Sequence, residues 1–412
     1  MHSDTGFLLT IVVLCYAVVS GVVRRWYVAP ALIFVVIGIA LGPSTLGLTE
    51  DGRGAEGFIV LAQLALTVIL FNQASMLDLR HVFSRGHLTV RLLAIGIPTT
   101  IALGTLTAVL LLPVLPLWEA ACLAVIVAPT EVALIDALLE DQRIPEHLRG
   151  VLSAETGLYD GIALAALLAT LAIASEQVDH AVGHWVWFVL RTEFVSVAVG
   201  IAIGLFGAAV ISRSRQRGWM SDTWAQLATL ALALVCFGVG ERLHASGFVA
   251  AFAGGLAYAL LSPNSGEMVE GTQVSAAAAQ LLELLVFALF GAFTVIPAWR
   301  EADWRVVVFA VVAVFGVRLV AVAVALIGSG EPMSNTAFIG WFGPRGIGTL
   351  VLGLLVVEEG NIVHESVLAQ VVVVSVTLSL LVHSITAPVG IRLIARPEPP
   401  ADTRSPSVAD TA

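Results

Sequence analysis

Apolar runs of about 20 residues recur along almost the whole chain, separated by short polar connections. An apolar helix of that length crosses a bilayer, and in lipid only helices or closed barrels satisfy their backbone hydrogen bonds. Charged residues make up 12% of the chain, whereas soluble domains carry about 25%. The sequence therefore predicts an all-α integral membrane protein. We expect about thirteen spans, near residues 6–23, 29–47, 58–76, 88–112, 117–139, 147–174, 184–211, 219–240, 244–261, 275–297, 303–327, 335–357 and 365–394.

The basic residues predict how these spans are oriented. All 20 of them are arginines. With the amino end outside, the cytoplasmic connections hold 12 arginines and the outer connections hold 4, which follows the positive-inside rule. We therefore expect a plasma-membrane protein with its amino end outside, its carboxyl end in the cytoplasm and a transmembrane domain over residues 1–395. The Pro-rich tail, residues 396–412, is expected to be disordered.

Two of the predicted spans are interrupted by a proline close to a charge. Pro129 precedes Glu131 in the fifth span, and Pro344 precedes Arg345 in the twelfth. Proline breaks the helical hydrogen-bond ladder, and exposed backbone at this depth is tolerated only inside protein or beside a water-filled cavity. Two broken helices in corresponding halves are typical of an inverted-repeat transporter, with its site where the breaks meet. Glu131 would then offset the partial positive charge of helix amino ends, and Arg345 would offset the partial negative charge of helix carboxyl ends. Two unrelated proline kinks are the alternative.

The sixth span carries two carboxylates within residues 153–164. An ionised acid costs a few kcal/mol at bilayer depth, so such a residue is expected to face protein or water. Thr156 and Asp160 share a helix face at i,i+4, and Glu155 forms a second such pair with Tyr159. The central Arg318, in the eleventh span, needs an acidic partner, and we expect it to be Glu155 because Asp160 must stay free to titrate. A structural ion pair is the alternative for Asp160.

Other motifs limit the chemistry. No GxxxxGK[ST] phosphate loop and no HExxH motif occur, and the three cysteines have no ligand-like spacing. The sequence therefore predicts no cofactor, no ATP-driven pump and no metalloprotease, and we expect neither an enzyme nor a nucleic-acid partner. We expect the remaining intramembrane acids, Asp136 and Glu283, to be structurally paired or to face water.

Five motifs, in order and at compatible spacing, resemble the monovalent cation/proton antiporters, on the sodium/proton exchanger branch. The resemblance covers nearly all of the chain, from about residue 24 to residue 393. The motifs are residues 25–43, similar to the family's early "R…P…lGxxLGP" span; 128–131 (APTE), similar to its "PTDP" crossing segment; 155–161 (ETGLYDG), similar to its "ESLLNDG" ion site; 246–256 (SGFVAAFAGGL), similar to "SGFLAxFxAGL"; and 341–346 (WFGPRG), similar to "WxGxRG".

The resemblance implies a function and a site. Asp160 would bind a monovalent cation and a proton alternately, with Thr156 and the backbone at Thr130 completing the cation shell. It further implies a homodimer in the lipid bilayer, an elevator-like movement of a core domain and roughly six spans per repeat. The implied supporting residues are the ion pair of Glu155 with Arg318, and Glu131 with Arg345 at the crossed helix ends.

The chain departs from the family pattern at three positions. Tyr159 stands where most exchangers have Asn and electrogenic relatives have Asp, which leaves a single ionisable group at that pair and favours electroneutral one-for-one exchange. Narrowing of the site is the alternative effect of Tyr159. Glu131 replaces Asp and is followed by Val132 rather than Pro. Asn72 occupies roughly the place of an acidic ligand on the third span, which leaves the choice between Na⁺ and K⁺ open.

The expected mechanism is competition at one carboxylate. Partial dehydration favours the protonated form of Asp160, and hard oxygen ligands suit Na⁺, Li⁺ or K⁺. If only the neutralised site crosses the barrier, one gradient drives the other through alternating access. A cation channel with Asp160 lining its pore, and a non-transporting sensor on the same scaffold, are the alternatives.

Overall fold

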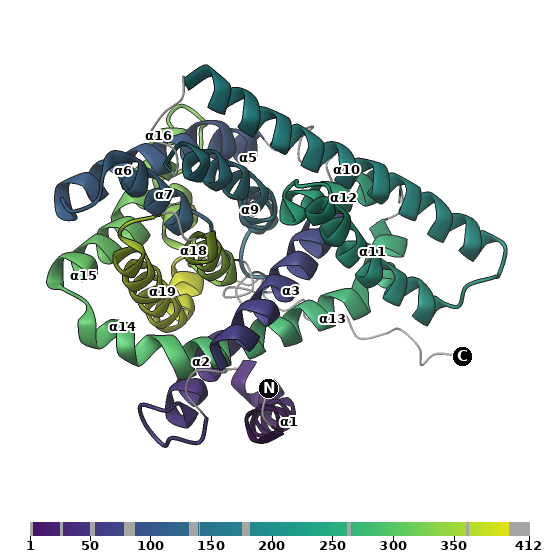
Figure 1. The fold of residues 1–412 in the computed structure, drawn as a ribbon, viewed down its shortest axis with the longest axis horizontal. Coiled ribbons are helices and arrows are strands. Elements are labelled where there is room, and N and C mark those ends of the chain that lie inside the picture. Colours follow the sequence, from purple (N-terminus) through teal and green to yellow (C-terminus); the bar gives the residue numbers. More distant parts are fainter. Residues whose placement is uncertain are drawn as a thin grey trace, which may run out of the picture.

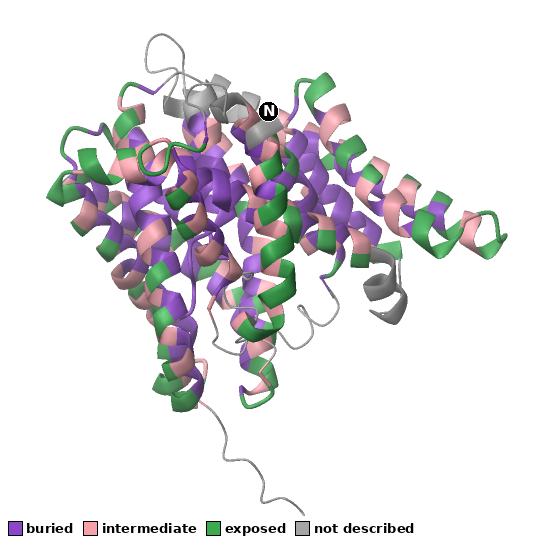
Figure 2. Ribbon diagram, turned by 90° about the horizontal axis from the view of Figure 1, so that it is seen from below, coloured by how far each residue is buried: buried purple, intermediate pink, exposed green. Residues whose placement is uncertain are grey.

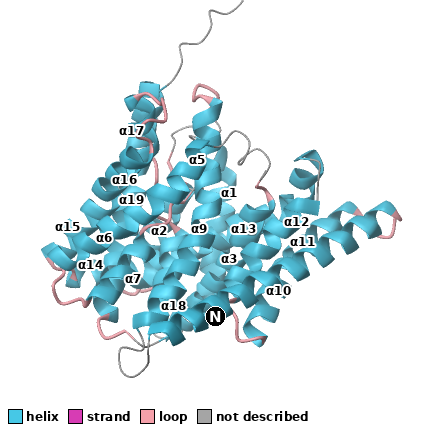
Figure 3. Cartoon of the chain, turned by 90° about the horizontal axis from the view of Figure 1, so that it is seen from above, coloured by secondary structure: helices cyan, strands magenta, loops and turns pink. Residues whose placement is uncertain are grey.

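The computed structural model describes residues 3–24, 28–49, 54–77, 87–131, 139, 141–174, 182–261, 265–359 and 362–394. All the regular elements in these ranges are helices (Figure 3). The predicted tail, residues 396–412, lies outside the described residues.

Figure 1 shows the arrangement of the described helices. In chain order, with η marking π-helical segments, they are α1 (Ser3–Arg24), α2 (Pro30–Leu41), α3 (Gly54–Ser75), α5 (His87–Arg91), η1 (Leu92–Gly96), α6 (Ile97–Leu111), α7 (Leu117–Val127), α9 (Glu146–Ala174), α10 (Val182–Gln216), α11 (Asp222–Arg242), α12 (Gly247–Leu261), α13 (Ser265–Phe290), η2 (Gly291–Val295), α14 (Ile296–Glu301), α15 (Trp304–Val311), η3 (Val312–Val317), α16 (Arg318–Ala325), α17 (Met333–Trp341), α18 (Ile347–Glu359) and α19 (Glu365–Ile394).

The helices account for the thirteen predicted spans. Within the described ranges, nine are long and apolar enough to cross a membrane, and four shorter apolar helices lie in the second, fifth, ninth and twelfth spans. The second span is helical only to Leu41, short of the expected residue 47. Pro43 explains the early end, because proline pushes the preceding residue out of the α region, and Gly42 has an extended backbone (φ −63°, ψ 162°).

Apart from the first span, α1, the spans form two groups (Figure 1). We call α5 to α9 with α15 to α19 the bundle, and α2, α3 and α10 to α13 the panel. Helices of the panel approach one another at glycines: a Cβ at Gly204 of α10 would overlap the carbonyl oxygen of Gly254 in α12, and one at Gly38 of α2 would overlap that of Ala288 in α13. Such backbone-to-backbone packing is how small residues join membrane helices, so the panel is tightly packed.

The bundle has internal symmetry. The fourth and eleventh spans each contain a π-helical segment (η1 and η3), and the fifth and twelfth each contain a helix end with extended chain behind it. Equivalent spans are seven apart, and because seven is odd they cross the membrane in opposite directions, as inverted repeats require. Exposed residues lie mainly on the outer faces and buried residues in the interior (Figure 2). The buried charged residues include Glu131, Glu155, Asp160, Arg318 and Arg345.

Candidate functional site

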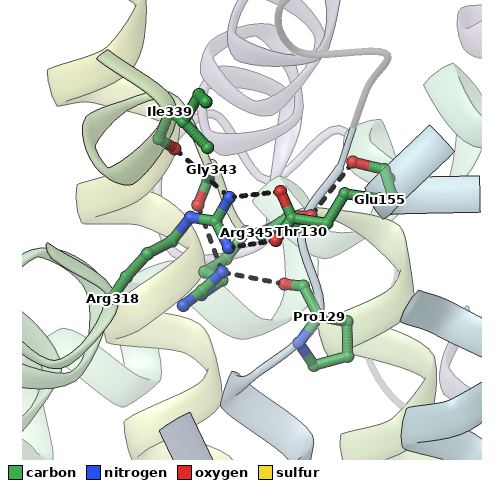
Figure 4. Close-up of polar contacts among 8 residues, drawn as sticks. Pro129, Thr130, Glu155, Arg318, Ile339, Gly343 and Arg345 are labelled. Atoms are coloured by element: carbon green, nitrogen blue, oxygen red, sulfur yellow. Dashed lines mark hydrogen bonds and ion pairs between the residues drawn. The ribbon is translucent and has the colours of Figure 1, made fainter. Parts of the chain in front are cut away.

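Two extended segments lie side by side in the bundle (Figure 4). α7 ends at Val127 and residues 128–131 continue without helical structure; α17 ends at Trp341 and α18 begins only at Ile347. The backbone N–H of Glu131 donates to the carbonyl of Pro344, with N and O 2.8 Å apart. The two prolines remove helical donors, and this bond satisfies part of the backbone they release.

Arg345 lies between the helix ends of the crossing and is fully buried. Its Nη1 donates to the carbonyl oxygens of Pro129 (3.2 Å) and Gly343 (3.1 Å), which follow the carboxyl ends of α7 and α17 (Figure 4). Helix carboxyl ends carry partial negative charge, so a guanidinium there is favourable. The backbone N–H of Arg345 donates to Oγ of Ser379 at 2.7 Å, which attaches the segment to α19.

Two carboxylates lie at the amino end of α18. A Cβ at Gly346 would overlap the side chain of Glu131, and one at Gly348 would lie 3.0 Å from Oδ1 of Asp160. Both glycines therefore let a carboxylate approach the first turn of α18, where the unpaired N–H groups give partial positive charge. Glu131 and Asp160 are 2% and 5% exposed.

Asp160 lies on α9 beside two hydroxyl groups. Thr156, one turn earlier on the same helix, has its Oγ1 3.0 Å from Oγ1 of Thr130 in the extended segment. All three side chains are buried, and Oδ1 of Asp160 has no hydrogen-bond partner among the described residues. A carboxylate with neighbouring hydroxyl oxygens is a donor set suited to a proton or to a small hard cation.

Glu155 is paired instead. Arg318 donates from Nη1 and Nη2 to its two carboxylate oxygens, at 2.9 and 3.0 Å, and from Nη2 to the carbonyl of Ile339 at 3.3 Å (Figure 4). A Cβ at Gly343 would overlap the guanidinium of Arg318, so only glycine fits there. The pair joins α9 to α16 and is 2–3% exposed.

The other predicted site residues make different contacts. Tyr159 is buried in the apolar core of the protein, within electrostatic reach of the charged groups at the crossing. Asn72, on α3, donates from Nδ2 to Sδ of Met76 at 3.8 Å, and its Oδ1 has no partner among the described residues. Glu283 is buried on α13, and Asp136 lies outside the described residues.

Sequence reasoning missed two groups that contact the broken spans. The buried His383 and Ser379 of α19 contact the break of the twelfth span; the signal available was a histidine inside an apolar run. At the amino end of α7, Glu119 accepts from the backbone N–H of Val363 (3.1 Å) and lies 2.8 Å from Nδ1 of His364. Only the fold reveals this second group, since its members are 244 and 245 residues apart.

Known proteins resemble this chain over most of its length. A probable Na⁺/H⁺ antiporter of Schizosaccharomyces pombe is 27% identical over 388 residues, covering 89% of this chain and 50% of that protein. A sodium, potassium, lithium and rubidium/H⁺ antiporter of Bacillus subtilis is 25% identical over 323 residues, covering 76% of this chain and 46% of that protein. The chain thus spans half or less of the length of these curated relatives.

Solved structures share the fold. The sodium proton antiporter MjNhaP1 from Methanocaldococcus jannaschii superimposes with a TM-score of 0.78 at 17% identity, over 95% of this chain and 99% of that one. The family model for the transmembrane region of sodium/hydrogen exchangers matches residues 9–391. This chain therefore belongs to the sodium/hydrogen exchanger family of multi-pass membrane transporters.

Proposed function

We propose that this protein is a secondary antiporter that exchanges protons for a monovalent cation by competition at Asp160. The observation that carries the proposal is the contrast between two acids five residues apart on α9. Glu155 is bound by Arg318 through two short hydrogen bonds. Asp160 keeps an oxygen without a partner among the described residues, beside the hydroxyl pair of Thr130 and Thr156.

The charges of the crossing support one-for-one exchange. The described residues there contribute two cations, Arg318 and Arg345, and three acids, Glu131, Glu155 and Asp160. With all five ionised, the group carries one net negative charge in a region that excludes water. One proton or one monovalent cation at Asp160 neutralises it, so both loaded states carry the same charge and exchange is electroneutral.

The helix arrangement supports alternating access. Asp160, the extended segments and α18 all belong to the bundle, whereas the panel is held together by backbone contacts at glycines. Movement of the bundle against the panel would carry the site between the two sides without rebuilding it. A site that is charged when empty resists this movement, and one filled by either ion does not.

Na⁺ is the first candidate cation, with Li⁺ and K⁺ as alternatives. The names of the relatives include both Na⁺/H⁺ antiporters and, from Alkalimonas amylolytica, a K⁺/H⁺ antiporter. Asn72 offers an amide where the family pattern has an acid, and fewer anionic ligands weaken the preference for the smaller, more strongly hydrated ion. K⁺/H⁺ exchange is therefore the second candidate function.

The same proposal covers the setting of the transporter. We place residues 1–395 in the plasma membrane with the amino end outside and residues 396–412 in the cytoplasm, following the arginine bias. A homodimer in the bilayer is part of the proposal, since α1 leaves most of its apolar surface uncovered within one chain. The reaction is transport, with no enzymatic step and no cofactor.

Proteoliposomes test the proposal directly. Purified protein is reconstituted with a pH gradient, and proton movement is followed on addition of Na⁺, Li⁺, K⁺ or Rb⁺, with and without a clamped membrane potential. We expect saturable, cation-dependent proton flux that the clamp does not change and that Asp160→Asn abolishes. Asp222→Asn, which alters an acid that is 87% exposed, is the matched control and should retain full flux.

The outcomes separate the alternatives. Full cation-dependent proton flux in Asp160→Asn would rule out competition at this carboxylate. Cation flux that does not saturate and is uncoupled from protons would identify a channel instead. If the protein exchanges none of the four cations for protons, the result would favour the alternative of a non-transporting sensor.

A further inference from the structure

His383 connects both ends of the break in the twelfth span to α19. The side chain is 2% exposed. Its Nε2 lies 2.8 Å from the carbonyl oxygen of Trp341, the last residue of α17. Its Nδ1 lies 3.2 Å from Oγ of Ser379 and 2.8 Å from the carbonyl of the same residue. That Oγ accepts the backbone N–H of Arg345 at 2.7 Å.

One tautomer joins these contacts into a chain. With its proton on Nε2, the imidazole donates to Trp341 and accepts at Nδ1 from the hydroxyl of Ser379, whose oxygen accepts from Arg345. The carbonyl oxygen of Ser379, 2.8 Å from Nδ1, is not a partner in this tautomer, because both atoms are then acceptors. The chain begins at the carboxyl end of α17 and finishes two residues before α18. It therefore fixes the two sides of the extended segment relative to each other, with the links at Ser379 buried and the link to Trp341 partly buried.

The surroundings hold the ring in this orientation. His383 stacks on Phe315 of η3, with centroids 5.7 Å apart and planes at 26°. Nε1 of Trp341 donates to Oγ1 of Thr386 at 3.0 Å. Ser379, His383 and Thr386 are at positions i, i+4 and i+7 of α19, so one face of that helix contacts the break three times. The charged groups that act on the ring electrostatically are Arg345 and, less strongly, Arg318.

We infer that His383 is a positioning residue for the exchange reaction. By holding the carboxyl end of α17 and the backbone of Arg345, it sets where α18 begins, and Asp160 lies against the first turn of α18 at Gly348. Loss of the imidazole lets this helix start shift relative to the carboxylate, so cation binding weakens. The inference rests on the proposed function, because it concerns the geometry of the same cation site.

The experiment compares His383→Ala, His383→Gln and Ser379→Ala with the wild-type protein. Ser384→Ala is the matched control: its buried hydroxyl is on the same helix and has no partner among the described residues. The cation concentration for half-maximal exchange is measured in proteoliposomes with Na⁺ and Li⁺. The half-maximal Li⁺ concentration for thermal stabilisation of the purified protein measures binding without transport.

We expect His383→Ala and Ser379→Ala to raise both half-maximal concentrations about fivefold, the effect of one net hydrogen bond, with little change in maximal rate. His383→Gln, which keeps a side-chain N–H donor, should restore most of the affinity, and Ser384→Ala should match the wild type. Rescue by glutamine together with an affinity change at constant rate would not arise from general loss of packing.

Half-maximal concentrations that stay at the wild-type value in His383→Ala and Ser379→Ala would overturn the role of His383. Equal losses of rate in both histidine variants and in Ser384→Ala would overturn it too, because they would mark general damage to α19. If His383→Ala does not fold, Ser379→Ala decides alone. A wild-type protein that exchanges nothing would instead overturn the proposed function, and the inference with it.

Discussion

Arg318→Met is expected to destabilise this protein strongly. Arg318 makes two hydrogen bonds to Glu155, at 2.9 and 3.0 Å, and the pair is 2–3% exposed. The variant leaves the carboxylate away from water without its counter-charge. Removing one partner of a buried ion pair costs about 3–5 kcal/mol, because the remaining charge keeps its desolvation cost.

A double variant tests whether the loss of stability comes from the unpaired charge rather than from the loss of the arginine side chain itself. Glu155→Leu with Arg318→Met removes both charges and should recover most of the stability, since apolar side chains can replace a buried pair at little cost. The matched control is Arg215→Met, which breaks the surface pair with Asp222 (3.4 Å). An exposed pair of this kind contributes roughly 0–1 kcal/mol, so the control should unfold nearly like the wild type.

Thermal unfolding of the purified protein, followed by tryptophan fluorescence, measures the effect. With an unfolding entropy of about 2.1 cal/mol/K per residue over 412 residues, a loss of 4 kcal/mol lowers the midpoint by about 5 °C. A shift in Arg318→Met no larger than in the Arg215 control would refute the reasoning. So would a double variant less stable than the single one, because the two charges would then not depend on each other.

Three further variants test other contacts. Gly343→Ala should lower the unfolding midpoint and the rate of exchange, because its Cβ would displace the guanidinium of Arg318. Gly204→Leu should prevent α10 and α12 from packing and reduce the yield of folded protein, measured by size-exclusion chromatography after membrane extraction. Thr156→Ala removes the hydroxyl contact with Thr130 and should weaken cation binding about fivefold, measured as the half-maximal Li⁺ concentration for thermal stabilisation.

Each of these variants has a control or an opposing outcome. Gly238→Ala, at a helix position where a Cβ meets nothing within 4 Å, should leave the protein as stable as the wild type or more stable. A Gly204→Leu protein as abundant as this control would contradict the packing argument. Unchanged exchange by Gly343→Ala, or unchanged Li⁺ dependence of Thr156→Ala, would contradict the other two.

The sequence alone determined the number of spans and the positions of the two breaks. Both follow from local physical chemistry: a span needs a fixed length of apolar helix, and a proline removes a backbone donor wherever it stands. The same locality placed Asp160 beside Thr156 on one face of α9, because i,i+4 neighbours on a helix are adjacent by geometry. The partner of Arg318 was predicted by elimination among the few intramembrane charges.

Only the tertiary structure decided which residues hold the broken helices in place. His383 contacts a carbonyl 42 residues away, and Glu119 contacts a loop 244 residues away. No periodicity relates such positions, because they depend on how whole helices pack against one another. Asn72, which stands roughly where the family pattern has an acidic ligand, donates to Met76 on its own segment, and its effect on the cation site stays a prediction. Local rules thus determine the helices and the positions of their breaks, whereas the packing of whole helices determines which side chains contact one another at the crossing.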